Sequence, residues 1–240
     1  MVITKDEHTV KSYDQDLSNL RNLVLEMGGL VEDQINRALK ALDDEDLTAA
    51  RDVIAKDQAV NAMHLKADEE SVNLLALRQP LGSDLRSIMS LAKTANDLER
   101  IGDEAEKVAR MVVHIYDSPT SPPSNRLFRD VMSTARLAVE MLRGSLDALA
   151  RLDVEKALTV AKRDAELDRE FQSALRYLIT YMMEDVRTIG HAINVIFMIK
   201  SLERIGDHAK NIAEYVIYLV KGTDIRHASV DDIEQGLLSG

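Results

Sequence analysis

The sequence contains no cysteine, and its 240 residues include only 10 glycines and 4 prolines. The absence of thiols excludes disulfides, thiolate metal ligands and cysteine nucleophiles, and it fits a cytosolic protein without requiring one. Aromatic residues make up only 4 % of the chain, and there is no tryptophan. Leu, Ala, Glu, Lys and Arg are abundant instead. This composition, rich in helix formers and poor in helix breakers, predicts an all-α protein.

Long apolar runs and a secretory signal are missing as well. No run of about 18 apolar residues occurs, so we expect no transmembrane helix. The first residues, MVITKDEHTVKSYDQDL, have neither an apolar core nor a cleavage signature, so no secretory signal is expected. The formal net charge of −11 at pH 7 argues against nucleic acid as the main partner. An acidic surface favours cations or a basic protein surface as partners.

A segment of six residues occurs twice in the chain. Leu98-Glu99-Arg100-Ile101-Gly102-Asp103 is repeated without change 104 residues later, at 202–207. An identical hexamer in so short a chain indicates an internal duplication. Within each copy the glutamate and the aspartate stand four residues apart. On a helix this spacing places both carboxylates on one face, one turn apart.

Apolar residues recur at steps of three and four in six long segments, which predicts six helices. We expect them at about 13–42, 47–77, 83–116, 126–150, 154–183 and 185–220. Residues 117–125 contain three of the four prolines and read as a linker between two halves.

The expected fold is therefore all-α, with two tandem three-helix bundles related by the duplication. The bundles are expected at 13–116 and 126–221. Residues 1–12 are expected to form a mobile N-terminal arm, and residues 222–240 a flexible tail.

Helical-wheel angles place the hexamer acids away from the core. With Leu98 at 0° and about 100° per residue, Glu99 lies near 100° and Asp103 near 140°, whereas the apolar positions cluster around 300°. We therefore expect Glu99 and Asp103, and their copies Glu203 and Asp207, on an exposed or flanking face. Glycine inside a helix costs roughly 1 kcal/mol. Its presence in both hexamers indicates that something approaches the helix closely there.

The preceding helix of each half carries acids inside its apolar stripe. Asp164 and Asp168 interrupt the stripe in the second half, and Asp57 and Asp68 do so in the first. Burying a carboxylate is costly unless it is paired or bound to a metal. Oxygen ligands suit cations such as Mg²⁺, Ca²⁺, Mn²⁺ or iron. The acids of two adjacent helices therefore predict one cation site in each half.

Two other readings of these acids stay open. Glu99-Arg100-Asp103 and its copy would each form an ordinary solvated ladder of salt bridges if no ion binds. A metal-dependent hydrolase built on a helical bundle is the alternative from another functional class. The sequence offers no evident general base beside the acids, and it contains no nucleotide-binding or acyl-transfer motif. We therefore expect no enzymatic activity.

Longer runs accompany the two hexamers. The first is 78–86, Arg-Gln-Pro-Leu-Gly-Ser-Asp-Leu-Arg, which is followed by 95–103, Ala-Asn-Asp-Leu-Glu-Arg-Ile-Gly-Asp. In the second half, Met-Glu-Asp-Val-Arg at 183–187 precedes the second hexamer, extended to 209. These runs resemble the PhoU family, and the resemblance covers about 13–221. It implies two three-helix bundles, multinuclear clusters of divalent or iron-type metal ions, and no enzymatic reaction.

The resemblance also assigns metal-binding residues by position. The hexamer acids Glu99, Asp103, Glu203 and Asp207 would bind metal, with Asp57, Asp164 and Asp168 as their partners. Asn61 stands where a strict Asp-x-x-x-Asp motif would place a second acid, so the first half departs from the family pattern.

Function and partners follow from the same resemblance. Family members repress the phosphate-starvation regulon by linking the ATPase subunit of the high-affinity phosphate ABC transporter to a PhoR-type sensor histidine kinase. We therefore expect a cytoplasmic negative regulator that reaches the membrane only through its partners and binds no nucleic acid directly. Contact with the transporter would favour a kinase conformation that dephosphorylates its response regulator. A homodimer is expected, because two long bundles leave apolar strips uncovered.

Overall fold

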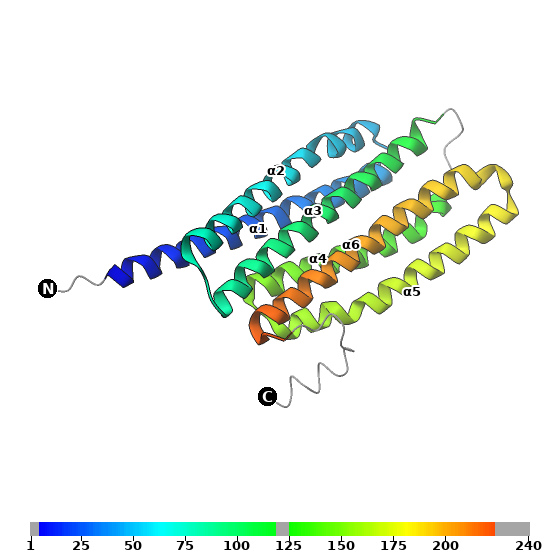
Figure 1. Cartoon of the computed structure of the whole chain (residues 1–240). Coiled ribbons are helices and arrows are strands. Elements are labelled where there is room, and N and C mark those ends of the chain that lie inside the picture. Colours follow the sequence, from blue (N-terminus) through cyan, green and yellow to red (C-terminus); the bar gives the residue numbers. More distant parts are fainter. Residues whose placement is uncertain (1–4, 119–124, 224–240) are drawn as a thin grey trace.

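The computed structural model describes residues 5–118 and 125–223, and the side chains of 13–118 and 127–223. This part of the chain is helical and contains no β-strand, so the predicted all-α fold is confirmed (Figure 1). Its elements are α1 (Lys5–Asp43), α2 (Leu47–Arg78), α3 (Ser83–Tyr116), the 3-10 helix η1 (Asn125–Phe128), α4 (Arg129–Arg151), α5 (Val154–Glu184), the 3-10 helix η2 (Val186–Thr188) and α6 (Ile189–Lys221).

The two halves form elongated three-helix bundles that lie side by side (Figure 1). Successive helices within each half run antiparallel. The main contact between the halves joins α3 to α6, the two helices that carry the repeated hexamers, and a smaller contact joins α1 to α4. Helices α2 and α5 lie on the flanks of the molecule (Figure 1). Each hexamer helix is therefore packed between its own bundle and the other half.

The two halves begin their second helix in the same way. Asp46 Oδ1 accepts hydrogen bonds from the backbone N–H groups of Thr48 and Ala49, both at 2.9 Å. Asp153 Oδ1 accepts one from the backbone N–H of Lys156 at 3.0 Å. Such caps satisfy N–H groups that have no partner within the helix. The duplication thus extends to the start signal of these helices.

The N-terminal boundary differs from the expectation. Helix α1 begins at Lys5, so residues 5–12 are helical and not part of a mobile arm. This segment contains neither proline nor glycine, and nothing in it interrupts the helix that follows. Residues 1–4 lie outside the described residues, as do 119–124 of the expected linker and 224–240 of the expected tail. The other predicted helices agree with the structure to within about one turn.

The hexamers themselves anchor the core. Leu98, Ile101, Leu202 and Ile205 are completely buried, and they belong to one hydrophobic core that contains residues of all six helices. Because the apolar positions of α3 and α6 are fixed in this core, their acids have fixed positions as well. None of the described helices is long and apolar enough to cross a membrane.

Candidate metal centres

In the first half, three helices come together beside Gly102 of α3. A Cβ atom added at this glycine would lie 3.4 Å from Asp57 Oδ1 of α2 and 3.4 Å from Gln34 Oε1 of α1. Gln34 Nε2 donates a hydrogen bond to Asp57 Oδ1 at 3.0 Å, and Asn61 Nδ2 donates one to Asp57 Oδ2 at 2.9 Å. Two amides thus hold the buried Asp57 carboxylate in place. The close approach predicted for Gly102 is confirmed.

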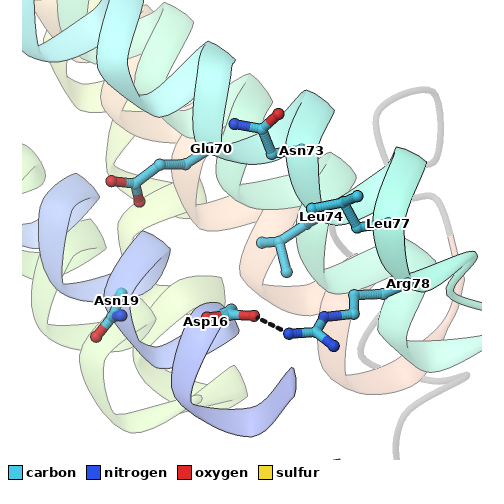
Figure 2. A pocket seen from close by; sticks show the side chains of 7 residues that line it. All are labelled: Asp16, Asn19, Glu70, Asn73, Leu74, Leu77 and Arg78. Carbon is cyan, nitrogen blue, oxygen red and sulfur yellow. Dashed lines mark hydrogen bonds and ion pairs between the residues drawn. The ribbon is translucent and has the colours of Figure 1, made fainter. Parts of the chain in front are cut away.

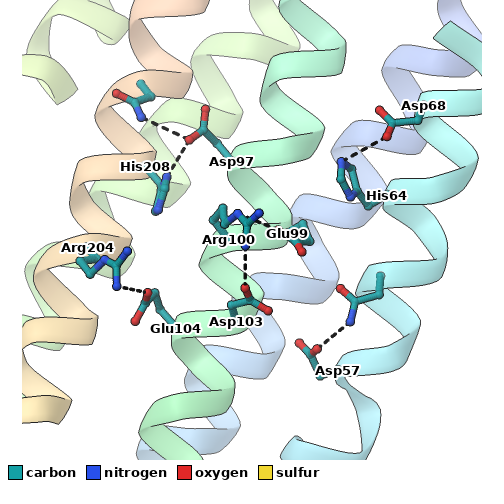
Figure 3. A network of polar contacts seen from close by, with 12 residues as sticks. Asp57, His64, Asp68, Asp97, Glu99, Arg100, Asp103, Glu104, Arg204 and His208 are labelled. Carbon is teal, nitrogen blue, oxygen red and sulfur yellow. Dashed lines mark hydrogen bonds and ion pairs between the residues drawn. The ribbon is translucent and has the colours of Figure 1, made fainter. Parts of the chain in front are cut away.

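The two hexamer acids of this half lie against Arg100 (Figure 3). Glu99 Oε2 is 3.3 Å from Arg100 Nε, and Asp103 Oδ2 is 3.2 Å from Arg100 Nη1. The Glu99 side chain is 17 % exposed and that of Asp103 is 30 % exposed. The predicted flanking position is therefore correct, but neither acid is fully exposed, because α2 packs beside them.

Two buried oxygens of this region accept no hydrogen bond from any described residue. They are Glu99 Oε2, whose contact with Arg100 lacks hydrogen-bond geometry, and Gln34 Oε1. Native proteins rarely leave buried acceptors without a donor. Carboxylate and amide oxygens are also the ligands that hard cations prefer in proteins. The donor atoms in the first half are therefore of the chemical type that a hard cation binds.

In the second half, Asp207 lies among three other carboxylates. Burial, then the neighbouring Glu203, Asp164 and Asp168, together raise the pKa of Asp207 to about 6, against a lowering effect of Lys200. The charges of these acids act on Asp207 because α5 packs against α6. Four acids in one region again form a group that a cation would stabilise.

Two lysines accompany these acids. Lys200 Nζ donates to Glu203 Oε2 at 2.5 Å, and Lys210 Nζ donates to Asp164 Oδ2 at 2.6 Å. Burial lowers the pKa of Lys210, but the hydrogen bond to Asp164 and the nearby Glu214 and Asp207 raise it above its ordinary value overall. Glu203 is buried, so the expectation of an exposed or flanking position was wrong for this residue.

Some of the predicted inward acids lie further out than expected. Asp168 was placed in the apolar stripe of its helix, but it is exposed. Asp68 is exposed as well, and its Oδ2 lies 3.6 Å from His64 Nε2. Both follow the inward acid of their helix by one turn or more, and wheel angles drift over that distance. Asp57 and Asp164 remain as the acids that face the hexamers.

The acids do not form a closed coordination shell. Across residues 5–118 and 125–223, no three carboxylate or imidazole groups are arranged as ligands of one ion. The seven predicted ligands fall into two sets, one on the helices of each half. They are Asp57, Glu99 and Asp103 in the first, and Asp164, Asp168, Glu203 and Asp207 in the second. Metal binding by these groups stays a prediction.

A further set of polar side chains joins the two halves (Figure 3). His208 Nδ1 of α6 lies 2.6 Å from Asp97 Oδ1 of α3, which also accepts a hydrogen bond from Asn211 Nδ2 at 3.2 Å. Arg204 Nη1 of α6 lies 2.9 Å from Glu104 Oε1 of α3. Sequence reasoning missed these contacts. The available signal was that Asp97 and Glu104 stand next to the core positions of α3, where acids are buried only with partners.

A pocket of about 290 Å³ between α1 and α2 lies apart from the acids (Figure 2). The Arg78 guanidinium, 2.8 Å from Asp16 Oδ2, forms one side of it. Leu74 and Leu77 contribute apolar surface. The pocket includes no hexamer residue and none of the inward acids, so it gives no support to a metal-dependent hydrolase.

One known family model matches the chain in two places. The model of the PhoU domain matches residues 24–112 and again residues 131–216. The chain belongs to the PhoU family. Each PhoU match lies within one of the three-helix bundles, so the duplicated hexamer marks two copies of the domain.

Individual PhoU proteins resemble the chain over almost its whole length. The phosphate-specific transport system accessory protein PhoU homolog of Pseudomonas aeruginosa is 46 % identical over 237 residues, 98 % of this chain and 97 % of that protein. The phosphate-specific transport system accessory protein PhoU of Escherichia coli K12 is 39 % identical over 235 residues, 98 % of this chain and 95 % of that protein.

Two solved PhoU structures share the fold. The crystal structure of PhoU from Pseudomonas aeruginosa has a TM-score of 0.81 and 49 % identity, and it covers 88 % of this chain and 100 % of that one. The phosphate transport system regulatory protein PhoU from Streptococcus pneumoniae has a TM-score of 0.80 and 29 % identity, with 88 % and 98 % covered. The predicted pair of tandem bundles is thereby confirmed as a PhoU-like fold.

Proposed function

We propose that this chain is the accessory protein of a phosphate-specific transport system and that it keeps phosphate-starvation genes repressed when phosphate is plentiful. The observation that carries the proposal is the 46 % identity with a relative of that name over 98 % of the chain. The relatives are named as accessory or regulatory proteins, which supports a role without catalysis.

The proposed partners are the ATPase subunit of the phosphate ABC transporter, a PhoR-type sensor histidine kinase and a second copy of the chain. Contact with the transporter would favour the kinase conformation that dephosphorylates its response regulator. Large apolar side chains at the end of α5, in η2 and in the first half of α6 support a protein partner. Met183, Val186 and Phe197 are 80 %, 71 % and 58 % exposed. Exposed apolar groups of this size are typical of interaction surfaces.

Gene deletion and replacement test the regulatory role. A phosphate-starvation reporter in the native host should stay silent in phosphate-rich medium. It should switch on when the gene is deleted, and fall silent again when the gene is returned on a plasmid. If the deletion strain keeps the reporter silent in rich phosphate, the regulatory proposal fails.

We also place a cation site in each half. Asp57, Glu99 and Asp103 would hold the first ion, with Gln34 Oε1 as a neutral ligand, and Glu203, Asp207, Asp164 and Asp168 would hold the second. The oxygens without donors and the raised pKa of Asp207 support this. A bound cation would neutralise acids that otherwise repel one another, and would tie the hexamer helix to its neighbours.

Ligand-dependent stability tests the cation sites. A ligand that binds only the folded state at about 100 times its Kd stabilises that state by about 2.7 kcal/mol. Excess Mn²⁺ should therefore raise the Tm of the chelator-treated chain by several degrees. The rise should disappear in the combined variant Glu99→Gln, Asp103→Asn, Glu203→Gln and Asp207→Asn. It should persist in Glu140→Gln, which changes an acid of α4 that pairs with Arg163 and belongs to neither proposed site.

A further inference from the structure

We propose that the arginine of the repeated hexamer is a displaceable counter-ion of the cation sites, and that Glu104 and His208 decide where each copy of it lies. The two arginines, Arg100 and Arg204, occupy the same position in identical hexamers. Their side chains nevertheless lie in different places (Figure 3). The inference rests on the proposed function in one respect, since it takes the hexamer acids to bind cations.

Arg204 lies across the contact between the two halves. Its Nη1 is 2.9 Å from Glu104 Oε1, and the Glu104 side chain is only 4 % exposed. An ion pair with so buried a carboxylate is screened less by solvent than a surface pair. Arg204 is thereby held away from the Glu203 and Asp207 carboxylates of its own hexamer.

Arg100 instead covers the acids of its own hexamer. It lies 3.3 Å from Glu99 Oε2 and 3.2 Å from Asp103 Oδ2, and its side chain is 54 % exposed. The guanidinium therefore occupies the oxygens that a cation in the first half would use. A cation can bind these oxygens only by displacing Arg100 or by sharing them with it.

One difference between the repeats explains the two positions. The residue four places after the hexamer arginine is Glu104 in the first copy and His208 in the second. Arg204 of α6 pairs with the Glu104 carboxylate on α3. The corresponding residue for Arg100 is His208, which offers no carboxylate and is engaged with Asp97 at 2.6 Å. The Arg100 guanidinium therefore pairs with Glu99 and Asp103 of its own helix.

This arrangement couples the first cation site to the contact between the halves. A cation that replaces Arg100 on Glu99 and Asp103 frees a positive charge on α3, the helix that packs against α6. In the second half the Arg204–Glu104 pair has the opposite effect, because it keeps the Arg204 guanidinium away from Glu203 and Asp207. The lysines of the second site, Lys200 and Lys210, lie outside the hexamer. At the corresponding positions of the first half the chain has Asn96 and Glu106.

Mn²⁺ titration of the full chain tests the proposal, with free Mn²⁺ followed by electron paramagnetic resonance. The double variant Glu203→Gln, Asp207→Asn removes acids of the second site, so that Mn²⁺ binding reports on the first site. In this background Arg100→Gln should lower the Mn²⁺ Kd by roughly three- to tenfold, the range expected for one partly screened charge. His208→Glu, which offers Arg100 a carboxylate across the contact, should lower it as well. Arg110→Gln should not change it, since this exposed arginine of α3 pairs with Glu106.

The second site is tested in the reverse background, Glu99→Gln with Asp103→Asn. Here Glu104→Gln should raise the Mn²⁺ Kd by roughly three- to tenfold, because the released Arg204 then competes for Glu203 and Asp207. Circular dichroism of each variant checks its helical fold. Unchanged Kd values in both Arg100→Gln and Glu104→Gln would overturn the inference and leave the cation sites standing. If the native chain binds no Mn²⁺, the cation sites themselves fail, and this inference with them.

Discussion

His208 Nδ1 on α6 lies 2.6 Å from Asp97 Oδ1 on α3, and this pair joins the two halves of the molecule. Asp97 is almost completely buried, and it also accepts a hydrogen bond from Asn211 Nδ2 at 3.2 Å. Asp97→Ala would leave both donors without their acceptor at a packed contact. We predict a loss of about 2 kcal/mol in the free energy of unfolding, measured by urea denaturation.

A double-mutant cycle isolates this pair from the rest of the contact. Asp97→Ala and His208→Ala should together cost less than the sum of the single changes, by at least about 0.5 kcal/mol. Additive costs would mean that the two side chains do not stabilise the contact through each other.

Gly206 of α6 is predicted to tolerate no larger residue, because α5 packs closely against it. A Cβ atom at this position would overlap Leu167 Cδ2, and Leu167 is buried on α5 close to Asp164. Alanine is favoured over glycine in a helix by roughly 1 kcal/mol, but overpacking typically costs 1–3 kcal/mol. Gly206→Ala should therefore lower the free energy of unfolding by about 1 kcal/mol in urea.

Gly29→Ala is the matched control for this prediction. Nothing lies within 4 Å of a Cβ added at Gly29 of α1. The substitution should therefore stabilise the chain by up to about 1 kcal/mol. If Gly206→Ala also stabilises the chain, the close approach of α5 to α6 is not a constraint.

Asp207 is predicted to destabilise the metal-free protein at neutral pH. Burial and the neighbouring Glu203, Asp164 and Asp168 raise its pKa to about 6, so its ionised form is disfavoured in the folded state. Asp207→Asn should raise the free energy of unfolding by about 1 kcal/mol at pH 7 in the presence of a chelator, with allowance for partial exposure. Asp103→Asn should bring no such gain, because Asp103 is paired with Arg100. A loss of stability in Asp207→Asn would contradict the repulsion among these acids.

Tyr116 is predicted to weaken the fold in alkaline solution. Burial, then Glu45 and Asp43, raise its pKa from 10.0 to about 12. Between these two pH values the unfolded chain loses the phenolic proton before the folded chain does. The free energy of unfolding therefore falls as the pH rises from 10 to 12. The stabilisation that the protonated Tyr116 provides is fully present only below pH 10. Urea denaturation should show a shallower fall over this range in Tyr116→Phe. Parallel curves for the two proteins would show that Tyr116 ionises equally in both states.

The repeat made most of the fold predictable from the sequence. The hexamers, the proline-rich segment and the apolar periodicity located the two bundles, and the paired acid motifs located two groups of carboxylates. Helix α1 was placed too late, because residues 5–12 carry no strong apolar period although they contain no helix breaker.

The contacts between elements were harder to predict. Periodicity tells which side of α3 is buried, but it does not tell whether that side meets the same bundle or the other one. Asp97 and Glu104 were therefore missed, although both are buried against α6. Gln34 was missed for a similar reason, since a polar residue of α1 gains meaning only once Gly102 is known to lie beside it.

Elemental analysis of the chain, purified without chelator or affinity metal, tests the central claim that the duplicated acids hold cations. We predict that the native protein retains metal, and that Glu99→Gln and Glu203→Gln each lose part of it while Glu140→Gln retains it all. Native protein that contains no metal, whether freshly isolated from cells or after incubation with divalent cations and iron, would contradict the claim.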